Sequence, residues 1–220
     1  MGYEVGEWTV QVLENGLPRL PDHLEPGETV PVAFWRGQRF GAVLHMRLWR
    51  NGRWDSDCAV TERDAEGGWE HPSSWAGGGW VNPFERPDDG WDGEPVLWIG
   101  RRLLGFDDDA DDESPRADHL EYMAGETNLE LRGSFRRPCR LENLLSEEDF
   151  PIRVQEGMAA RVVAAIEVQQ GDRKTVYAID SPTGAFVVGV ESPGAAVLRP
   201  LGHDKQLLAD SEGRPVEAIL

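Results

Sequence analysis

The sequence is poor in cysteine and has no long apolar run. Its two cysteines, Cys58 and Cys139, are too few for a disulfide framework or a zinc site of their own, so we expect thiols. The longest apolar runs, such as Val162–Ile166 and Ala185–Val190, are too short to cross a bilayer. Residues 1–10 lack a basic region and an apolar stretch, which predicts no secretory signal and a place in the cytoplasm.

Lysine is nearly absent, and acidic residues dominate the charge. Arginine outnumbers lysine 20 to 2, a skew typical of GC-rich bacterial coding. The formal net charge of −18 would repel a phosphate backbone, so we expect no nucleic-acid partner. The same field can steer a basic protein toward the chain. It is also compatible with a simple role in solubility, because net charge alone specifies no function.

Tryptophan and acid are unevenly distributed along the 220 residues. All nine tryptophans lie within residues 1–98. Residues 106–120 carry seven acidic side chains against one arginine and show no apolar period, which predicts a solvated acidic loop or linker. We therefore expect a Trp-rich part over residues 1–105 and a plainer part over residues 121–220. The two parts are either separate domains or halves of one packed domain.

The N-terminal part has strand-like runs around one turn signal. An alternating run covers Glu7–Leu13, and a second strand is expected at Thr29–Trp35. Asn51-Gly52 lies between two further runs and favours a two-residue type I′ hairpin. That register would place Trp49 opposite Trp54 and His45 opposite Cys58. The face they share would also carry Val43 and Val60, and we expect it to point inward.

Residues 67–100 combine eight glycines, four prolines and five tryptophans. Glycine and proline interrupt regular elements, so we expect a long ordered loop over residues 67–95 with few strands of its own. Large rings can anchor such a loop by burying roughly 150–250 Å² each. A strand is expected to follow at Pro95–Leu104.

The C-terminal part reads as a β meander after one helical segment. Leu141, Leu144 and Leu145 have helical spacing within residues 140–150. Four strand-like segments with turn signals between them follow, at Ala160–Gln169, Lys174–Asp180, Ala185–Glu191 and Ala195–Leu201. This spacing predicts an all-β protein with antiparallel sandwich or barrel-like sheets and at most one or two short helices.

Standard catalytic and phosphate-binding motifs are missing. The sequence has no Gly-x-Ser-x-Gly, no His-Glu-x-x-His and no phosphate-binding loop. No cofactor is expected, and an enzyme becomes less favoured without being excluded. An adjacent pair of acids, Asp88-Asp89, could act as catalytic carboxylates but is also typical of a turn.

The main candidate binding site lies in the aromatic loop. Its rings and polar groups suit protein recognition, sugar stacking or a cation held over an indole, whereas a small core beneath the loop is the structural alternative. The candidate binding residues are Trp75, Trp80, Trp91, Asn82, Asp88 and Asp89.

Two further candidates are weaker. Asp107, Asp109 and Asp111 occupy alternate positions of a calcium-loop template, but Asp112 stands where the sharp turn requires glycine. His45 opposite Cys58 could lower the pKa of the thiol and create a nucleophile, although a packed His and Cys is the ordinary outcome.

Together these features favour a non-catalytic, cytoplasmic binding protein. It would present an aromatic loop and an acidic surface to a protein partner of basic character, as an adaptor, an inhibitor or an immunity-type protein does. The alternatives are a small-molecule hydrolase with its site at the Trp-rich loop and intracellular carbohydrate recognition.

Overall fold

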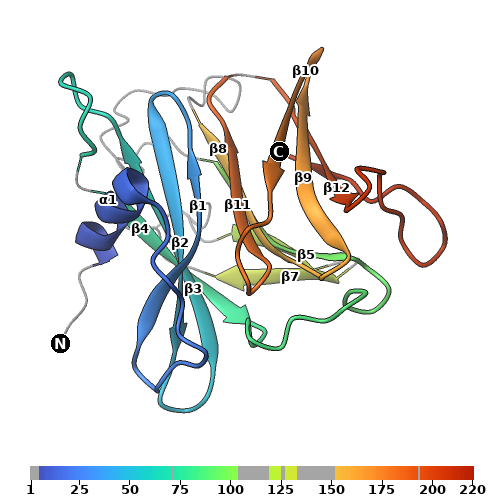
Figure 1. Ribbon diagram of the computed structural model, residues 1–220, viewed down its shortest axis with the longest axis horizontal. Coiled ribbons are helices and arrows are strands. Elements are labelled where there is room, and N and C mark those ends of the chain that lie inside the picture. The colour runs from blue at the N-terminus through green and yellow to red at the C-terminus, as the bar shows by residue number, and fades with distance from the viewer. Residues whose placement is uncertain (1–4, 71, 104–118, 125–126, 133–151, 193) are drawn as a thin grey trace.

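The computed structural model describes residues 5–70, 72–103, 119–124, 127–132, 152–192 and 194–220. These residues form one short helix and a set of antiparallel strands, which confirms the all-β prediction (Figure 1). In chain order the elements are α1 Val5–Asn15, β1 Thr29–Arg36, β2 Phe40–Leu48, β3 Trp54–Glu62, β4 Ser73–Trp80, β5 Val96–Leu103, β6 His119–Ala124, β7 Thr127–Arg132, β8 Arg153–Ala159, β9 Val163–Gln170, β10 Arg173–Ala178, β11 Ala185–Val190, β12 Val197–Gly202 and β13 Ala218–Ile219. None of the described helical residues belongs to a segment long and apolar enough to span a membrane.

Three of the sheets are stacked in layers. The first sheet has the order β1-β2-β3-β4, the middle sheet β11-β8-β5 and the third sheet β10-β9-β12-β13, while β6 and β7 form a separate hairpin. In Figure 1, α1 lies on the outer side of the first sheet, and β9, β10 and β12 lie on the opposite side of the molecule. The middle sheet therefore has another sheet on each face.

Two apolar clusters hold the layers together. The first cluster joins side chains of β1, β2 and β3 to side chains of β8 and β11. The second lies between the middle and third sheets and includes Trp98 and Phe186, whose rings meet edge to face at 5.5 Å. Every residue of β8 and β11 is buried, as expected of strands covered on both faces. Residues from both sequence halves thus share one core.

Strand β8 has no counterpart among the sequence predictions. Its residues Gln155, Glu156 and Gly157 break the alternation of apolar and polar residues that marks a half-buried strand. Gly157 is required by packing, because a Cβ atom there would lie 2.5 Å from the ring of Phe186. β8 can carry such residues because it lies between two strands, and the backbone hydrogen bonds to both of them stabilise it.

The alternating run at Glu7–Leu13 is not a strand but most of helix α1. The three residues that α1 buries are Thr9, Val12 and Leu13, which have helical spacing. Val12 and Leu13 pack on Val43 of β2, on the outer face of the first sheet. The helix therefore gains its stability from this contact, which local alternation cannot reveal.

Part of the expected loop over residues 67–95 is strand β4, the edge of the first sheet. Its backbone pairs antiparallel with β3, from Val60 opposite Ser73 to Trp54 opposite Trp80. Three glycines in β4 weaken its intrinsic preference for a strand, but the neighbouring strand supplies a template of backbone hydrogen bonds. Irregular structure is confined to the connections on either side of β4.

Four hairpins share one turn geometry. In each hairpin, the N–H of the residue before the loop donates to the carbonyl of the residue after the loop, four positions later. The N–H of the third loop residue donates back to the carbonyl of the residue before the loop. This third loop residue, which is Gly52, Gly67, Lys205 or Gly213, has a positive φ. This pattern is that of a three-residue hairpin loop with a bulge, in which one residue takes the left-handed conformation.

The type I′ prediction for Asn51-Gly52 is therefore wrong. Among described non-glycine residues only Asp92 and Lys205 have a positive φ, so Asn51 does not take the left-handed conformation that a type I′ turn requires. The Asn51 side chain instead accepts a hydrogen bond from the Arg53 N–H at 3.1 Å. The longer loop shifts the β2–β3 register by one residue.

The predicted strands of the C-terminal part correspond to β9, β10, β11 and β12, with small shifts at their ends. The expected strands at Thr29–Trp35 and Pro95–Leu104 correspond to β1 and β5. The predicted helix over residues 140–150 and nearly all of the acidic segment 106–120 lie outside the described residues.

Candidate functional site

The connection between β4 and β5, residues 81–95, carries four of the six candidate binding residues. Arg86 anchors it, because its guanidinium donates to the carbonyls of Ala159 and Ala160 at 2.8 Å each, where β8 ends. Backbone N–H groups of Arg161 and Val162 donate to carbonyls of the connection at 2.9 and 3.0 Å. Burial and the nearby charge of Arg161 lower the pKa of Arg86 from its ordinary value. Side-chain and backbone hydrogen bonds thus hold the connection against the β8–β9 turn.

Asn82 and Trp91 have structural contacts in this connection. The Asn82 side chain accepts a hydrogen bond from the Phe84 N–H at 3.0 Å, which closes a turn. Phe84 packs on Trp54, with ring centroids 5.8 Å apart. Trp91 is half-buried and packs against the cluster between the first and middle sheets. These contacts order the backbone, so the connection depends on aromatic anchors as the sequence suggested.

The acidic candidates of the connection point to solvent. Asp88 pairs with Arg161 at 3.1 Å, although its side chain is 85% exposed. Asp89 is also exposed, as are Glu85 and Asp92. These exposed carboxylates form an acidic rim around residues 85–92.

A turn with two carboxylates, both paired with Arg214, lies beside this rim. A Cβ atom added to Gly93 would lie 2.9 Å from the side chain of Ser211, so the turn over residues 210–214 is adjacent. Asp210 accepts hydrogen bonds from the N–H groups of Glu212 and Arg214 at 2.8 and 2.9 Å, and its pKa is lowered mainly by the second bond. The sequence offered no reason to group this turn with the connection, because more than a hundred residues separate them.

The remaining candidate residues are less informative. Trp75 and Trp80 lie on β4, where their backbones face Cys58 and Trp54 of β3. The weak metal candidates Asp107, Asp109 and Asp111 lie outside the described residues. Among the residues that the structure does describe, no group of three or more His, Cys, Asp or Glu side chains is arranged to hold a metal ion.

The proposed pairing of His45 with Cys58 is wrong. In the observed register His45 lies opposite Asp57, and Cys58 lies opposite Leu44. Successive residues point to opposite faces of a sheet, so the imidazole faces α1 while the thiol belongs to the cluster between the sheets. The one-residue shift therefore removes this candidate nucleophile.

His45 occupies a closed environment beneath α1. The Thr9 hydroxyl donates to the Val5 carbonyl at 2.7 Å, so its oxygen is left to accept from His45 Nε2 at 3.0 Å. The second ring nitrogen, Nδ1, is buried and has no hydrogen-bond partner among the described residues. Burial, aided by the charge of Arg47, lowers the pKa of His45 to about 3. The neutral imidazole is a structural link between α1 and β2.

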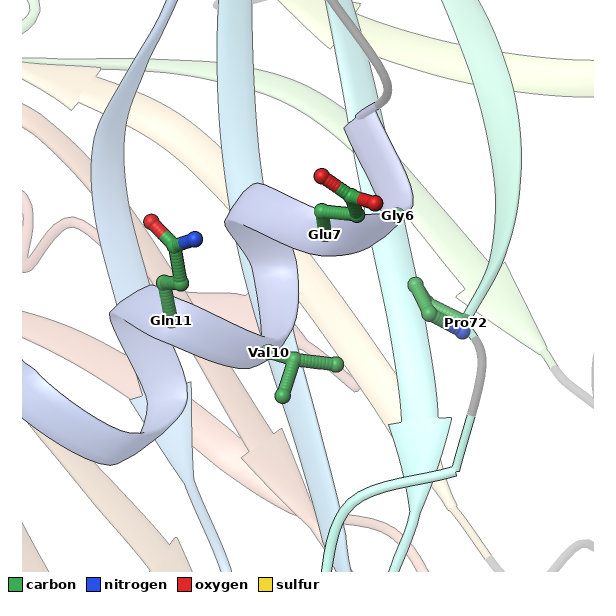
Figure 2. Close-up of a pocket in the computed structure, with 5 residues that line it drawn as sticks. All are labelled: Gly6, Glu7, Val10, Gln11 and Pro72. Carbon is green, nitrogen blue, oxygen red and sulfur yellow. The ribbon is translucent and has the colours of Figure 1, made fainter.

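A hollow of about 380 Å³ opens beside the same helix. Figure 2 shows that it is lined by one side of α1 and by Pro72, which precedes β4. Its lining residues are Gly6, Glu7, Val10, Gln11 and Pro72. Glu7 is the single titratable group among them, whereas a hydrolase requires converging acid, base or nucleophile groups.

The most exposed described tryptophan was not among the candidate binding residues. Trp49, at the β2–β3 hairpin, is 42% exposed. Its indole donates to the Asp55 carboxylate at 2.5 Å, and the Arg47 guanidinium lies 5.2 Å from the ring centroid. A two-residue turn at Asn51-Gly52 would place Trp49 on an inward face, whereas the observed three-residue loop leaves it exposed.

Comparison with known proteins leaves the fold and the site as the basis for function: no protein-family model, curated protein or solved structure matches this chain.

Proposed function

We propose that this chain is a non-catalytic binding protein that presents the acidic rim of residues 85–92 to a protein partner of basic character. The observation that carries the proposal is a set of exposed carboxylates on a connection held in one conformation by Arg86 and by backbone hydrogen bonds. A rim that is already ordered loses little conformational entropy when a partner binds. A cytoplasmic adaptor, inhibitor or immunity-type protein would use such a surface.

The electrostatics support a basic partner. The net charge of −18 attracts a basic protein over a Debye length of about 8–10 Å at ordinary ionic strength, and the rim concentrates that charge locally. Trp91 lies within the same connection and is only half-buried, so part of its surface is open to a partner. The negative charge would increase the association rate, and contact with the Trp91 ring would slow dissociation of the complex.

The test is affinity capture from a bacterial lysate with a charge-reversed rim. Glu85 and Asp89 are exposed, and their side chains make no hydrogen bond or ion pair with another described residue, so E85K/D89K changes charge without breaking a contact. The matched control E14K/D172K makes the same charge change at exposed residues of α1 and the β9–β10 turn. Quantitative mass spectrometry should find one or more basic proteins with the wild type and the control, and about tenfold less with E85K/D89K. Equal recovery with all three proteins would contradict the proposal.

A further inference from the structure

The turn between β1 and β2 directs three consecutive backbone N–H groups at one carboxylate. Gln38 N donates to Glu191 Oε2 at 2.9 Å, and Arg39 N and Phe40 N donate to Oε1 at 2.8 and 2.6 Å. Glu191 follows β11, so it is about 150 residues away in sequence and belongs to the end of the middle sheet. Successive N–H groups that converge in this way form a concave anion-binding nest.

The turn is shaped around its occupant. Gly37 N donates across the hairpin to Phe40 O at 2.8 Å, whereas Phe40 N points to Glu191. A Cβ atom on Gly37 would lie 2.3 Å from Glu191 Oε1, so a larger residue at this position would displace the carboxylate. Arg39 lies in the turn, but its guanidinium pairs with Glu62, and the guanidinium of the preceding Arg36 donates to the Val12 carbonyl at 3.5 Å. The three backbone donors therefore suit an oxyanion.

We propose that the turn over residues 37–40 is a carboxylate-binding site that this chain fills with its own Glu191. The site takes small carboxylates, because a planar group with two oxygens satisfies all three N–H donors together. Occupied by Glu191, it fastens the β1–β2 hairpin of the first sheet to the end of β11 in the middle sheet. This inference is independent of the acidic rim and of any partner bound there.

An external carboxylate must compete with a tethered one. The folded backbone holds Glu191 directly against the turn, so its effective concentration is far higher than that of a flexible tether and far above the acetate concentration of the test, and a weakly binding carboxylate cannot displace it from the wild-type protein. Removing the Glu191 side chain leaves the donors in place and opens the site to solvent, because the carboxylate is only partly buried. The vacant nest should then bind acetate.

The experiment measures thermal unfolding of E191A with and without 100 mM sodium acetate, against sodium chloride at the same ionic strength. We expect the substitution to lower the melting temperature by about 5–10 °C, because three charge-assisted hydrogen bonds are lost. For an acetate dissociation constant of about 10 mM, acetate should recover about 3–5 °C of this loss. In two-dimensional NMR spectra, acetate should shift the amide signals of Gln38, Arg39 and Phe40 in E191A but not in the wild type.

Three variants make the test specific. E191Q fills the nest with an uncharged amide and should show no recovery in acetate. E191D keeps the charge but shortens the side chain, so it should be partly destabilised and respond weakly, and it serves if E191A does not fold. Glu212→Ala removes a carboxylate that is 68% exposed and should show no acetate-specific effect. An E191A or E191D protein that is indifferent to acetate, or an equal response in all variants, would overturn the proposal.

Discussion

The buried imidazole of His45 should make the protein sensitive to mild acid, and His45→Gln should remove most of that sensitivity. Glutamine is uncharged and can still hydrogen-bond to the Thr9 hydroxyl, which His45 contacts at 3.0 Å. The groups around the ring are Thr9 on α1, Arg47 on β2 and Asp57 directly across on β3. All of these stay unchanged in the variant, so a difference in pH dependence reports on His45 itself.

The magnitude follows from the pKa of His45, which falls from 6.5 to about 3 on folding. Below pH 6.5 the unfolded chain binds a proton that the folded protein does not, so the free energy of unfolding decreases as the pH falls. At pH 5 the folded imidazole is still neutral and the unfolded one is mostly charged, which costs about 2 kcal/mol relative to pH 7.5. Above pH 7.5 His45 no longer makes the free energy of unfolding depend on pH, because its imidazole is neutral in both the folded and the unfolded state.

The assay is urea denaturation of the wild type and His45→Gln at pH 7.5, 6.5, 5.5 and 5.0. The variant should be less stable at pH 7.5, because glutamine fills the site less well, but it should lose about 2 kcal/mol less than the wild type between pH 7.5 and pH 5. Other titrating groups are common to both proteins and cancel in the difference. Parallel stability curves over this range would refute the reasoning, since they would mean that His45 is protonated in the folded state or does not become exposed on unfolding.

Four other substitutions test the fold around the site. Arg86→Ala should lower the free energy of unfolding by about 2–3 kcal/mol and speed amide exchange in residues 81–95, because two hydrogen bonds to buried carbonyls are lost; unchanged exchange would contradict the anchoring role. Gly184→Ala should cost more than about 3 kcal/mol in chemical denaturation, since its Cβ would lie 2.2 Å from Ala159 O at a φ of +75°, whereas Gly171→Ala, with open space at +55°, should cost about 1 kcal/mol. Lys205→Gly should raise stability by about 0.5–1 kcal/mol, because Lys205 has a φ of 65° in a hairpin position where three other turns use glycine; a loss of stability would disprove this.

The Asn51-Gly52 turn shows how local chemistry can identify a hairpin and still misplace its side chains. The dipeptide marked the position of the turn correctly, and Gly52 takes the positive φ. The length of the loop depends on whether Asn51 also enters the left-handed region, and here its side chain bonds to Arg53 N instead. Because side chains alternate along a strand, this one-residue difference moved His45 away from Cys58 and placed it beneath α1.

The candidate site was predictable in part. The abundance of acid and the ring-anchored connection could be seen in the sequence, and Asp88 and Asp89 are exposed in the structure. The contacts of Arg86 with the end of β8 could not be foreseen, because nothing local distinguishes this arginine from the other nineteen. The same holds for Glu191, whose role depends on a turn about 150 residues earlier in the chain.

The sequence by itself determined the secondary-structure class, the positions of most turns and the strongly acidic charge. These properties depend on residues close to one another, through the φ preferences of glycine, the alternation of apolar side chains and the sum of ionised groups. The tertiary structure decided the rest: that residues 5–15 form a helix, that polar β8 is a central strand, and which charged groups meet. Each of these outcomes depends on contacts between distant segments, whose burial and hydrogen bonding outweigh local preference.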